Sequence, residues 1–236
     1  HYLISKDKGF LEAMWDVVEP AIDFVLELQT SRGEIIWARH SDGTPWSYAL
    51  LTGSSSISHS LRSAIAIANE LGLEKPQWEE ACQKLIKVLQ TTPDAFAPKE
   101  RWAMDWYYPV LTGVLRGESG INHLKEKSEI FEIESKGIRC VSDRPWVTTA
   151  ETCECAMAYQ GVGNTAHAIS LFEQIQDYRN EDGRYLTGMV YPDYVSFPED
   201  EHSTYSAAAV IITADSLIGL TDASQIFSNH DFLPVF

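Results

Sequence analysis

The sequence predicts an all-α fold, an α/α toroid in which helical hairpins form two concentric rings. Three observations predict it. Apolar residues recur at helical spacing through most of the chain, amphipathic helices alternate with helices of small uncharged residues, and part of the pattern repeats. A helix that is apolar or small on every side is buried on every side. We therefore expect small-residue helices in an inner ring and amphipathic helices in an outer ring.

Amphipathic helices with a charged face are expected at 10–29, 77–90 and 164–179. In the first, apolar side chains from Leu11 to Leu28 follow one another at steps of three and four residues. Pro20 lies inside this segment and is expected to kink the helix or to split it, because proline removes a backbone donor. These helices belong to the predicted outer ring.

The small-residue helices are expected at 54–71, 148–160 and 203–219, which are rich in Ala, Ser and Thr. Two further helices are expected within 106–117 and 121–131, which brings the total to about eight. The best candidates for strands are 137–143 and 184–191.

An internal repeat relates 21–37 to 168–185. The residues that correspond are Gln29, Gly33 and Trp37 in the first segment and Gln176, Gly183 and Tyr185 in the second. Each segment is followed by a loop and then by a small-residue helix. Such self-similarity is typical of stacked supersecondary units.

The length of 236 residues fits a single domain spanning 1–236. A net charge of −16, from 34 acidic and 18 basic residues, disfavours nucleic acid and anionic membranes as partners and suits a neutral substrate. No apolar run is long enough for a membrane helix, and no signal peptide is visible. We expect a cytoplasmic protein; its oligomeric state is left open.

The four cysteines do not form a disulfide framework and are interpreted as reduced thiols. Cys153 and Cys155 are separated by one residue, which is not the spacing of a zinc knuckle. A metal site that adds Cys140 and His167 is a minor alternative. The prediction is that the protein uses neither a metal nor another cofactor.

Four acids lie in loops or near the starts of helices, where the carboxyl pair of a glycoside hydrolase could form. Glu201 is the first choice as a catalytic residue, with Asp105 or Glu151 as its partner, and Asp143 is assigned with Arg144 to substrate binding. Each acid also has a structural interpretation. Glu201 and Glu151 would stabilise helix N-termini, with Ser203 or Thr204 capping the former helix and Thr148 or Thr149 the latter. Asp105 would pair with Arg101, and Asp143 would pair with Arg144 or Arg139.

Aromatic residues gather near these acids. Tyr107 and Tyr108 are consecutive, so on a helix they point about 100° apart and cannot share one core-facing stripe. Burial in a core is the alternative for all of them. The residues expected to contact a saccharide are Trp102, Trp106, Tyr107, Tyr108, Trp146, Tyr185 and Tyr191, with His202 as a polar contact.

The motif Ala-x-x-Phe-Val-x-x-x-Gln-x-x-x-Gly at 21–33 resembles the QW repeat of squalene and hopene cyclases and of prenyltransferases. More closely, the chain resembles bacterial "prenyltransferase-like" proteins of the terpenoid cyclase and six-hairpin glycosidase superfold. The matching segments are "LLTGSSSISHSLR", "MDWYYPVL", "RCVSDRPWVTTAETCE" and "STYSAAAVI".

Some members of that group resemble endo-acting α-mannosidases of methylated-polysaccharide clusters. The resemblance implies a glycoside hydrolase that cuts inside an α-linked manno- or gluco-polysaccharide. It also implies that an N-terminal hairpin with a "DPW" acidic motif lies outside this sequence. The second catalytic acid is therefore Asp105, Glu151 or an acid of that hairpin.

Two other functions fit the same fold. An isoprenoid-handling enzyme would need an Asp-x-Asp-Asp acid cluster, or a DDxxD motif with cations for a diphosphate, and the sequence contains neither motif. A non-catalytic toroid that binds saccharide or lipid needs no acid pair. A deep apolar pocket beside basic residues would favour the isoprenoid function.

Overall fold

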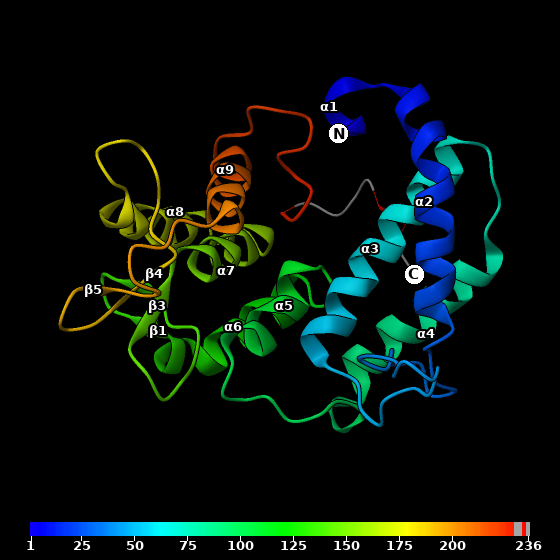
Figure 1. Cartoon of the computed structure of the whole chain (residues 1–236), viewed down its shortest axis with the longest axis horizontal. Helices are drawn as coiled ribbons and strands as arrows, with labels where there is room; N and C mark the ends of the chain where they lie inside the picture. The colour runs from blue at the N-terminus through cyan, green and yellow to red at the C-terminus, as the bar shows by residue number, and fades with distance from the viewer. Residues whose placement is uncertain (229–232, 235–236) are drawn as a thin grey trace. The chain divides into compact units, whose positions relative to one another are not determined.

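The computed structural model describes residues 1–228 and 233–234. By its internal contacts the chain divides into two compact units (Figure 1). The first comprises His1–Lys99 with the described C-terminal residues Leu233 and Pro234, and the second comprises the described residues from Glu100 onward to 228. The prediction of one toroidal domain over 1–236 stays a prediction.

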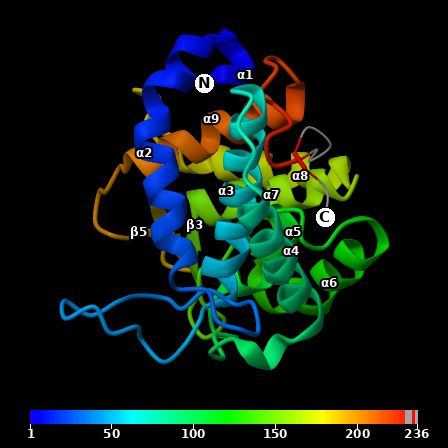
Figure 2. The same cartoon turned by 90° about the vertical axis from the view of Figure 1, so that its right-hand side faces the viewer.

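The first unit consists of helices. Its elements are α1 (Tyr2–Ser5), α2 (Lys8–Leu26), α3 (Leu51–Glu70), α4 (Pro76–Thr91) and the 3₁₀ helix η1 (Pro93–Ala95). Both α2 and α4 pack against α3, as Figure 2 shows. Their core includes Leu61 and Ile65 of α3 and Trp78 of α4. The α2 helix runs through Pro20 without a break, so of the two outcomes expected there, a kink or a split, the split does not occur.

The second unit is built around one central helix. Its helices are α5 (Ala103–Leu111), α6 (Gly117–Phe131), α7 (Thr149–Gly161), α8 (Thr165–Gln174), the 3₁₀ helix η2 (Ile175–Tyr178) and α9 (Thr204–Ile218). Three of them, α5, α8 and α9, pack on α7. Residues on every side of α7 are buried, which explains why its sequence shows so little amphipathic character.

Two small antiparallel sheets complete the second unit. One pairs β1 (Glu132–Ile133) with β2 (Gly137–Ile138). The other has the order β3 (Trp146–Thr148), β4 (Gly188–Val190) and β5 (Val195–Ser196), with Val147 opposite Met189. The strands expected at 137–143 and 184–191 are therefore present but shorter, and β1, β3 and β5 were not expected.

The small-residue helices do not all share one environment. Burial on every side is confirmed for 148–160 by α7, whereas α3 is buried on one side only, with Ser56 and Ser60 exposed. The expectation that 203–219 is buried on every side is wrong, since Ile211 and Ile218 of α9 are each 69% exposed. This helix, which carries one charged residue, Asp215, packs on α7 and α8 through one face and has apolar residues also on the other.

The repeat corresponds to two helix ends followed by a turn. The Gln29 amide donates to the carbonyl oxygens of Gly33 (3.0 Å) and Ala81 (2.8 Å). Gln176 donates to the Phe172 carbonyl (3.0 Å) and accepts from the Tyr185 hydroxyl (2.8 Å). The backbone turn is similar at both ends, with Gly33 matching Gly183. Arg179 and not Gln176 takes the place of Gln29, so that part of the expected correspondence is wrong.

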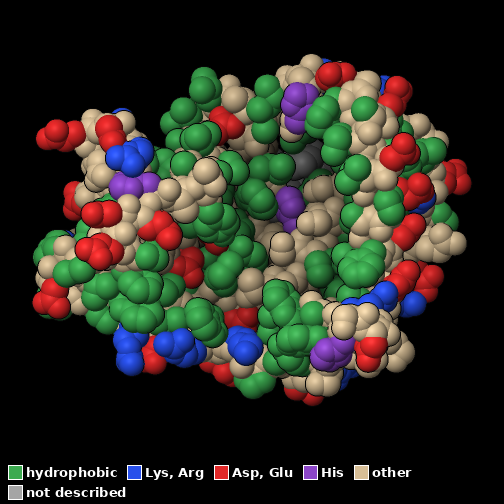
Figure 3. Space-filling view, in the orientation of Figure 1, with side chains coloured by type: hydrophobic (Ala, Val, Ile, Leu, Met, Phe, Trp, Pro, Cys, Tyr) green, Lys and Arg blue, Asp and Glu red, His purple; other side chains and the backbone are tan. Residues whose placement is uncertain are grey.

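Figure 3 shows acidic side chains scattered over the visible face, as expected from the net charge of −16. Within the part of the chain that the structure describes, no helix combines the length and the apolarity that a bilayer crossing requires.

Candidate active site

The N-terminal end of α7 is held in place by two strands. Thr149 donates its backbone N–H to the carbonyl of Thr187 (3.0 Å) and its hydroxyl to that of Leu186 (2.6 Å). On the other side, the Thr152 hydroxyl accepts from the N–H of Ile138 (2.9 Å). Gly137 allows this approach, because a Cβ there would lie 2.7 Å from the Thr152 hydroxyl oxygen. The first turns of α7 are therefore fixed by β2 and by the residues preceding β4.

Glu154, in the second turn of α7, is a buried carboxyl that accepts hydrogen bonds from three tyrosines. Tyr107 donates to Oε2 (2.5 Å), and Tyr108 (3.2 Å) and Tyr205 donate to Oε1. Glu154 is only 8% exposed, and this burial raises the pKa of its carboxyl. The hydrogen bonds from the three tyrosine hydroxyls lower that pKa.

Glu151 lies one helical turn before Glu154 and is partly exposed. Its Oε2 accepts a hydrogen bond from the hydroxyl of Thr148. Removal of the carboxyl from water raises the pKa of Glu151 to about 7, the negative charge of Glu154 adds to the rise, and the Thr148 hydrogen bond opposes it. A carboxyl with this pKa can hold a proton near neutral pH and release it to a substrate.

Glu201 is exposed and is connected to the same end of α7 through Thr187. The Thr187 hydroxyl donates to Glu201 Oε1 (2.9 Å), and the Thr187 N–H donates to the Glu201 carbonyl (2.8 Å). Since Thr149 binds the Thr187 carbonyl, the two predicted acids Glu201 and Glu151 are held by adjoining backbone segments. Ser203, not Glu201, caps α9 by accepting from the N–H of Ser206 (3.0 Å), which confirms the capping alternative for Ser203.

Asp105 is partly buried in the first turn of α5, the helix that also carries Tyr107 and Tyr108. Arg101 forms an ion pair with Asp143 (Nε to Oδ1, 2.9 Å), and this guanidinium lowers the pKa of Asp143. Arg144 is the second cation near Asp143, at 3.9 Å. The expected pairing of Asp143 with Arg144 is thus present, but Arg101 is the closer partner.

The aromatic residues of 101–111 have separate roles. Trp106 is 1% exposed, stacks on Phe131 (ring centroids 5.5 Å apart) and donates its indole N–H to the Leu124 carbonyl (3.1 Å). Trp102 is 45% exposed, and Arg101 lies over its ring. The core interpretation is confirmed for Trp106 and Tyr107, because both rings are enclosed and cannot line a cleft in this conformation.

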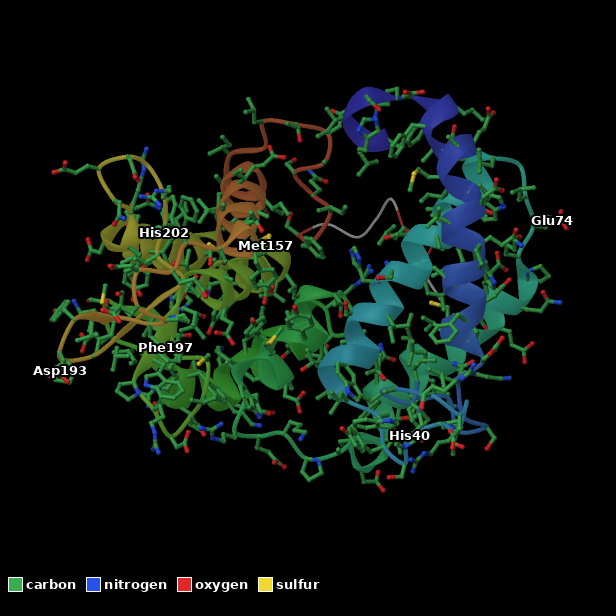
Figure 4. All side chains as sticks on the ribbon, viewed as in Figure 1. His40, Glu74, Met157, Asp193, Phe197 and His202 are labelled. Atoms are coloured by element: carbon green, nitrogen blue, oxygen red, sulfur yellow. The ribbon has the colours of Figure 1, made fainter. Side chains whose placement is uncertain are left out.

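The remaining predicted contacts lie around the β3–β4–β5 sheet. Trp146 stacks on Phe197 with ring centroids 4.7 Å apart, and His202 bonds to the side chain of Asn180 (2.8 Å). Tyr191 is buried and donates to the Tyr178 hydroxyl (2.9 Å). In Figure 4, Phe197 and His202 lie on this side of the unit, and Asp193 marks the tip of the β4–β5 turn. Roles for these residues, and for Tyr185, in substrate binding stay predictions.

Sequence reasoning missed Glu154, although the segment that contains it was assigned to a buried helix. One signal could have found it. An acid three residues after Glu151, inside a helix without other charges, must be buried and must find donors. The donors are tyrosine hydroxyls at least 46 residues away in the sequence, on α5 and α9.

A metal-binding cluster of three or more His, Cys, Asp or Glu residues is absent from the described residues. Cys140, Cys153 and Cys155 are free, and burial raises the pKa of each thiol. His167, the fourth member of the minor metal alternative, lies 3.1 Å from Glu132.

A cleft of about 320 Å³ opens at the C-terminal end of α9, away from Glu151. Its lining is neutral and consists of Gln160, Ser216, Leu217, Ile218, Gly219, Ser224, Gln225 and Ser228. The isoprenoid alternative requires cations for a diphosphate, and this lining supplies none.

Among known proteins, no family model matches the chain. The chain is 45% identical over 231 residues to the MMP endo-(1,4)-3-O-methyl-α-D-mannosidase of Mycolicibacterium hassiacum. The match covers 98% of this chain and 64% of the relative, so the chain spans less than two thirds of that enzyme's length. The resemblance to endo-α-mannosidases of methylated polysaccharides is thereby confirmed.

Solved structures of the GH76A α-1,6-mannanase of Salegentibacter sp. HEL1_6 share the fold. Two are inactive variants with two aspartates replaced, in complex with α-1,6-mannotriose (TM-score 0.64, 13% identity) and α-1,6-mannotetrose (0.64, 12%). A third structure of the enzyme gives 0.62 at 13% identity. Each match covers 89% of this chain and 67% or 68% of the mannanase. The predicted fold class, an α/α toroid of helical hairpins, is confirmed.

Proposed function

We propose that this chain carries catalytic groups of an endo-acting glycoside hydrolase that cleaves α-mannosidic bonds inside a mannose polysaccharide. One observation carries the proposal: at the fixed end of a buried helix, Glu151 is a partly exposed residue whose carboxyl group is removed from water, which raises its pKa to about 7. Its setting in a chain 45% identical to an endo-mannosidase supports this assignment.

In this proposal Glu151 is the general acid. Cleavage of a glycosidic bond leaves an alkoxide unless the leaving oxygen receives a proton as the bond breaks. Burial beside Glu154 gives Glu151 a proton to donate, and its partly exposed position lets a sugar oxygen approach. Such a positioned acid typically accelerates the reaction by ~10²–10⁴-fold.

Glu201 is our candidate for the second carboxyl, which must be ionised to act as a base or nucleophile. It is exposed, and the hydroxyl of Thr187 orients it (2.9 Å). Asp105 on α5 is the alternative within this chain. An acid outside the sequence is the remaining option, because the chain covers only part of its relative.

The substrate proposed is a neutral α-linked mannan with 3-O-methyl groups, by analogy with the relative. Exposed or half-buried aromatic rings near the acids could stack on the apolar faces of the sugars. Polar contacts are assigned to Asp143, Arg144 and His202. The aromatic residues are Trp102, Tyr108, Trp146 and Tyr185.

We also assign the protein to the cytoplasm. All four cysteines are free, as expected in a reducing compartment.

The test is hydrolysis of a 3-O-methylmannose oligosaccharide with α-1,4 links by the full-length protein. Glu151→Gln should lower the turnover ~10²–10⁴-fold while oligosaccharide binding is kept and thermal stability is not lowered. Glu201→Gln should do the same if it is the second carboxyl, and Asp105→Asn tests the alternative.

Glu199→Gln is the matched control, since Glu199 is an exposed acid in the loop that holds Glu201. It should leave the turnover unchanged. If Glu151→Gln keeps more than about a tenth of the wild-type turnover, the loss is too small for a general acid and the proposal is wrong.

A further inference from the structure

The two carboxyls of α7 differ in the number of hydroxyls that serve them. Glu154 accepts three hydrogen bonds, from Tyr107 and Tyr108 on α5 and from Tyr205 on α9. Among the residues that the structure describes, Glu151 accepts one, from Thr148. Hydrogen bonds donated to a carboxylate favour its ionised form. The environment of Glu154 therefore supports a negative charge better than that of Glu151.

Glu154 is not placed to react with a substrate. Both of its oxygens are occupied by tyrosine hydroxyls, and the residue is buried. A sugar or a water molecule would first have to displace a tyrosine. Its position is suited to acting through Glu151, which is three residues away on the same face of α7.

Two carboxyls this close cannot both ionise easily, because each negative charge raises the pKa of the other. When one proton is shared between such a pair, it resides on the group whose ionised form has fewer donors. Glu151, with a single donor, is that group.

We propose that Glu154 is a positioning residue of this site: its three tyrosines hold it as the anion of the pair, and its charge keeps the proton on Glu151. This inference rests on the proposed role of Glu151 as the general acid. It adds a function for Glu154 and for Tyr205, neither of which the sequence singled out.

The other groups around Glu151 do not offset this charge. From α5, Tyr107 and Tyr108 face it, and burial raises the pKa of both phenols, so they stay neutral. Cys140, between β2 and β3, is neutral for the same reason. Asp105 is the remaining carboxyl of α5, and the cation Arg101 is paired with Asp143. From α9, Tyr205 is bound to Glu154.

The direct test is an NMR titration of ¹³C-labelled glutamate side chains, with the Glu151 signal assigned from Glu151→Gln. In the wild-type protein we expect a midpoint of about 7 for Glu151. Glu154→Gln removes the neighbouring charge and should lower that midpoint by about one pH unit. Tyr205→Phe removes one donor from Glu154 and should lower it by less.

Tyr159→Phe is the matched control, since Tyr159 also lies on α7 and also donates to a glutamate, Glu132 (2.7 Å). It should leave the Glu151 midpoint unchanged. An unchanged midpoint in folded Glu154→Gln would overturn the inference. If that variant does not fold, as judged by its thermal melt, Tyr205→Phe decides in the same way.

A pH–rate profile separates this inference from the proposed function. If both hold, the basic limb of the profile moves to lower pH in Glu154→Gln by the same amount as the NMR midpoint. If the NMR midpoint moves but Glu151→Gln remains active, Glu154 controls the Glu151 proton and the general-acid assignment is wrong. If Glu151→Gln is inactive and neither midpoint nor limb moves in Glu154→Gln, only the role of Glu154 is wrong.

Discussion

Helices α3 and α7 are both small-residue helices buried among their neighbours, one in each unit, yet their polar groups differ. On α3 the buried polar residues include Ser58, His59 and Arg62, and the Arg62 Nε donates to the carbonyl of Pro234 (2.9 Å). On α7 the corresponding groups are the carboxyls Glu151 and Glu154. The shared small-residue pattern gives both helices a buried position, and the ionisable side chains decide what each can do.

Burial affects the proton of the α3 arginine differently from the protons of the α7 carboxyls. An arginine keeps its charge in a protein, so Arg62 can hold a carbonyl but cannot donate a proton at neutral pH. Removal of the Glu151 carboxyl from water raises its pKa to about 7, whereas Glu34, a buried carboxyl of the first unit, has its pKa lowered by hydrogen bonds from Arg32 and Thr30. The acid chemistry of the chain is therefore expected in the second unit.

The largest expected effect tests whether the two helices are packed alike. Leu61→Ala on α3 and Met157→Ala on α7 each remove a buried side chain. Each should lower the free energy of unfolding by about 2–5 kcal/mol, measured by urea denaturation. A loss below about 1 kcal/mol for one of them would show that its helix is less tightly packed than the other and would break the comparison.

The next effect concerns pH and should arise from α7. Because the pKa of Glu151 is raised in the folded protein to about 7, the native state binds this proton more tightly than the unfolded state. Its contribution to stability is full below the unfolded pKa near 4.5 and is lost as the pH rises through 7. The full loss should amount to about 3 kcal/mol.

Thermal or urea unfolding at several pH values between 4.5 and 7.5 measures this slope. Glu151→Gln should flatten it, and Glu199→Gln should leave it as it is. An equal slope in wild type and Glu151→Gln would mean that Glu151 titrates normally.

Particular residues show how much of the structure could be predicted from the sequence. The burial of α7 could be predicted from its small side chains, but the same pattern also predicts burial of α9, where Ile211 and Ile218 are exposed. The tyrosine contacts of Glu154 could not be predicted, since these tyrosines are distant in the chain and only the fold brings them together. Trp102 and Trp106 are four residues apart with the same chemistry, and their different exposure depends on the packing of α5 on its neighbours.

The third small-residue helix, α9, differs from α3 and α7 because it is exposed on one side and capped by a side chain. Ser203 accepts from the N–H of Ser206 there, whereas the residues preceding α3 and α7, Leu50 and Thr148, form no capping hydrogen bond. Ser203→Ala should lower the free energy of unfolding by about 1 kcal/mol. No loss in urea denaturation would show that α9 is held by packing alone.

The smallest effect on stability is expected for Thr148→Val, although this substitution bears directly on the acid end of α7. The Thr148 hydroxyl does not cap the helix but donates to Glu151. Valine has nearly the same shape and lacks the hydroxyl, so the change in the free energy of unfolding should stay within about 1 kcal/mol.

The hydrogen bond from Thr148 lowers the pKa of Glu151, so its loss should raise that pKa further and move the basic limb of the pH–rate profile to higher pH. Glu154→Gln is expected to move the same limb to lower pH. Opposite shifts from two neighbours would identify Glu151 as the titrating acid, and shifts of the same sign would mean that the limb reports another group.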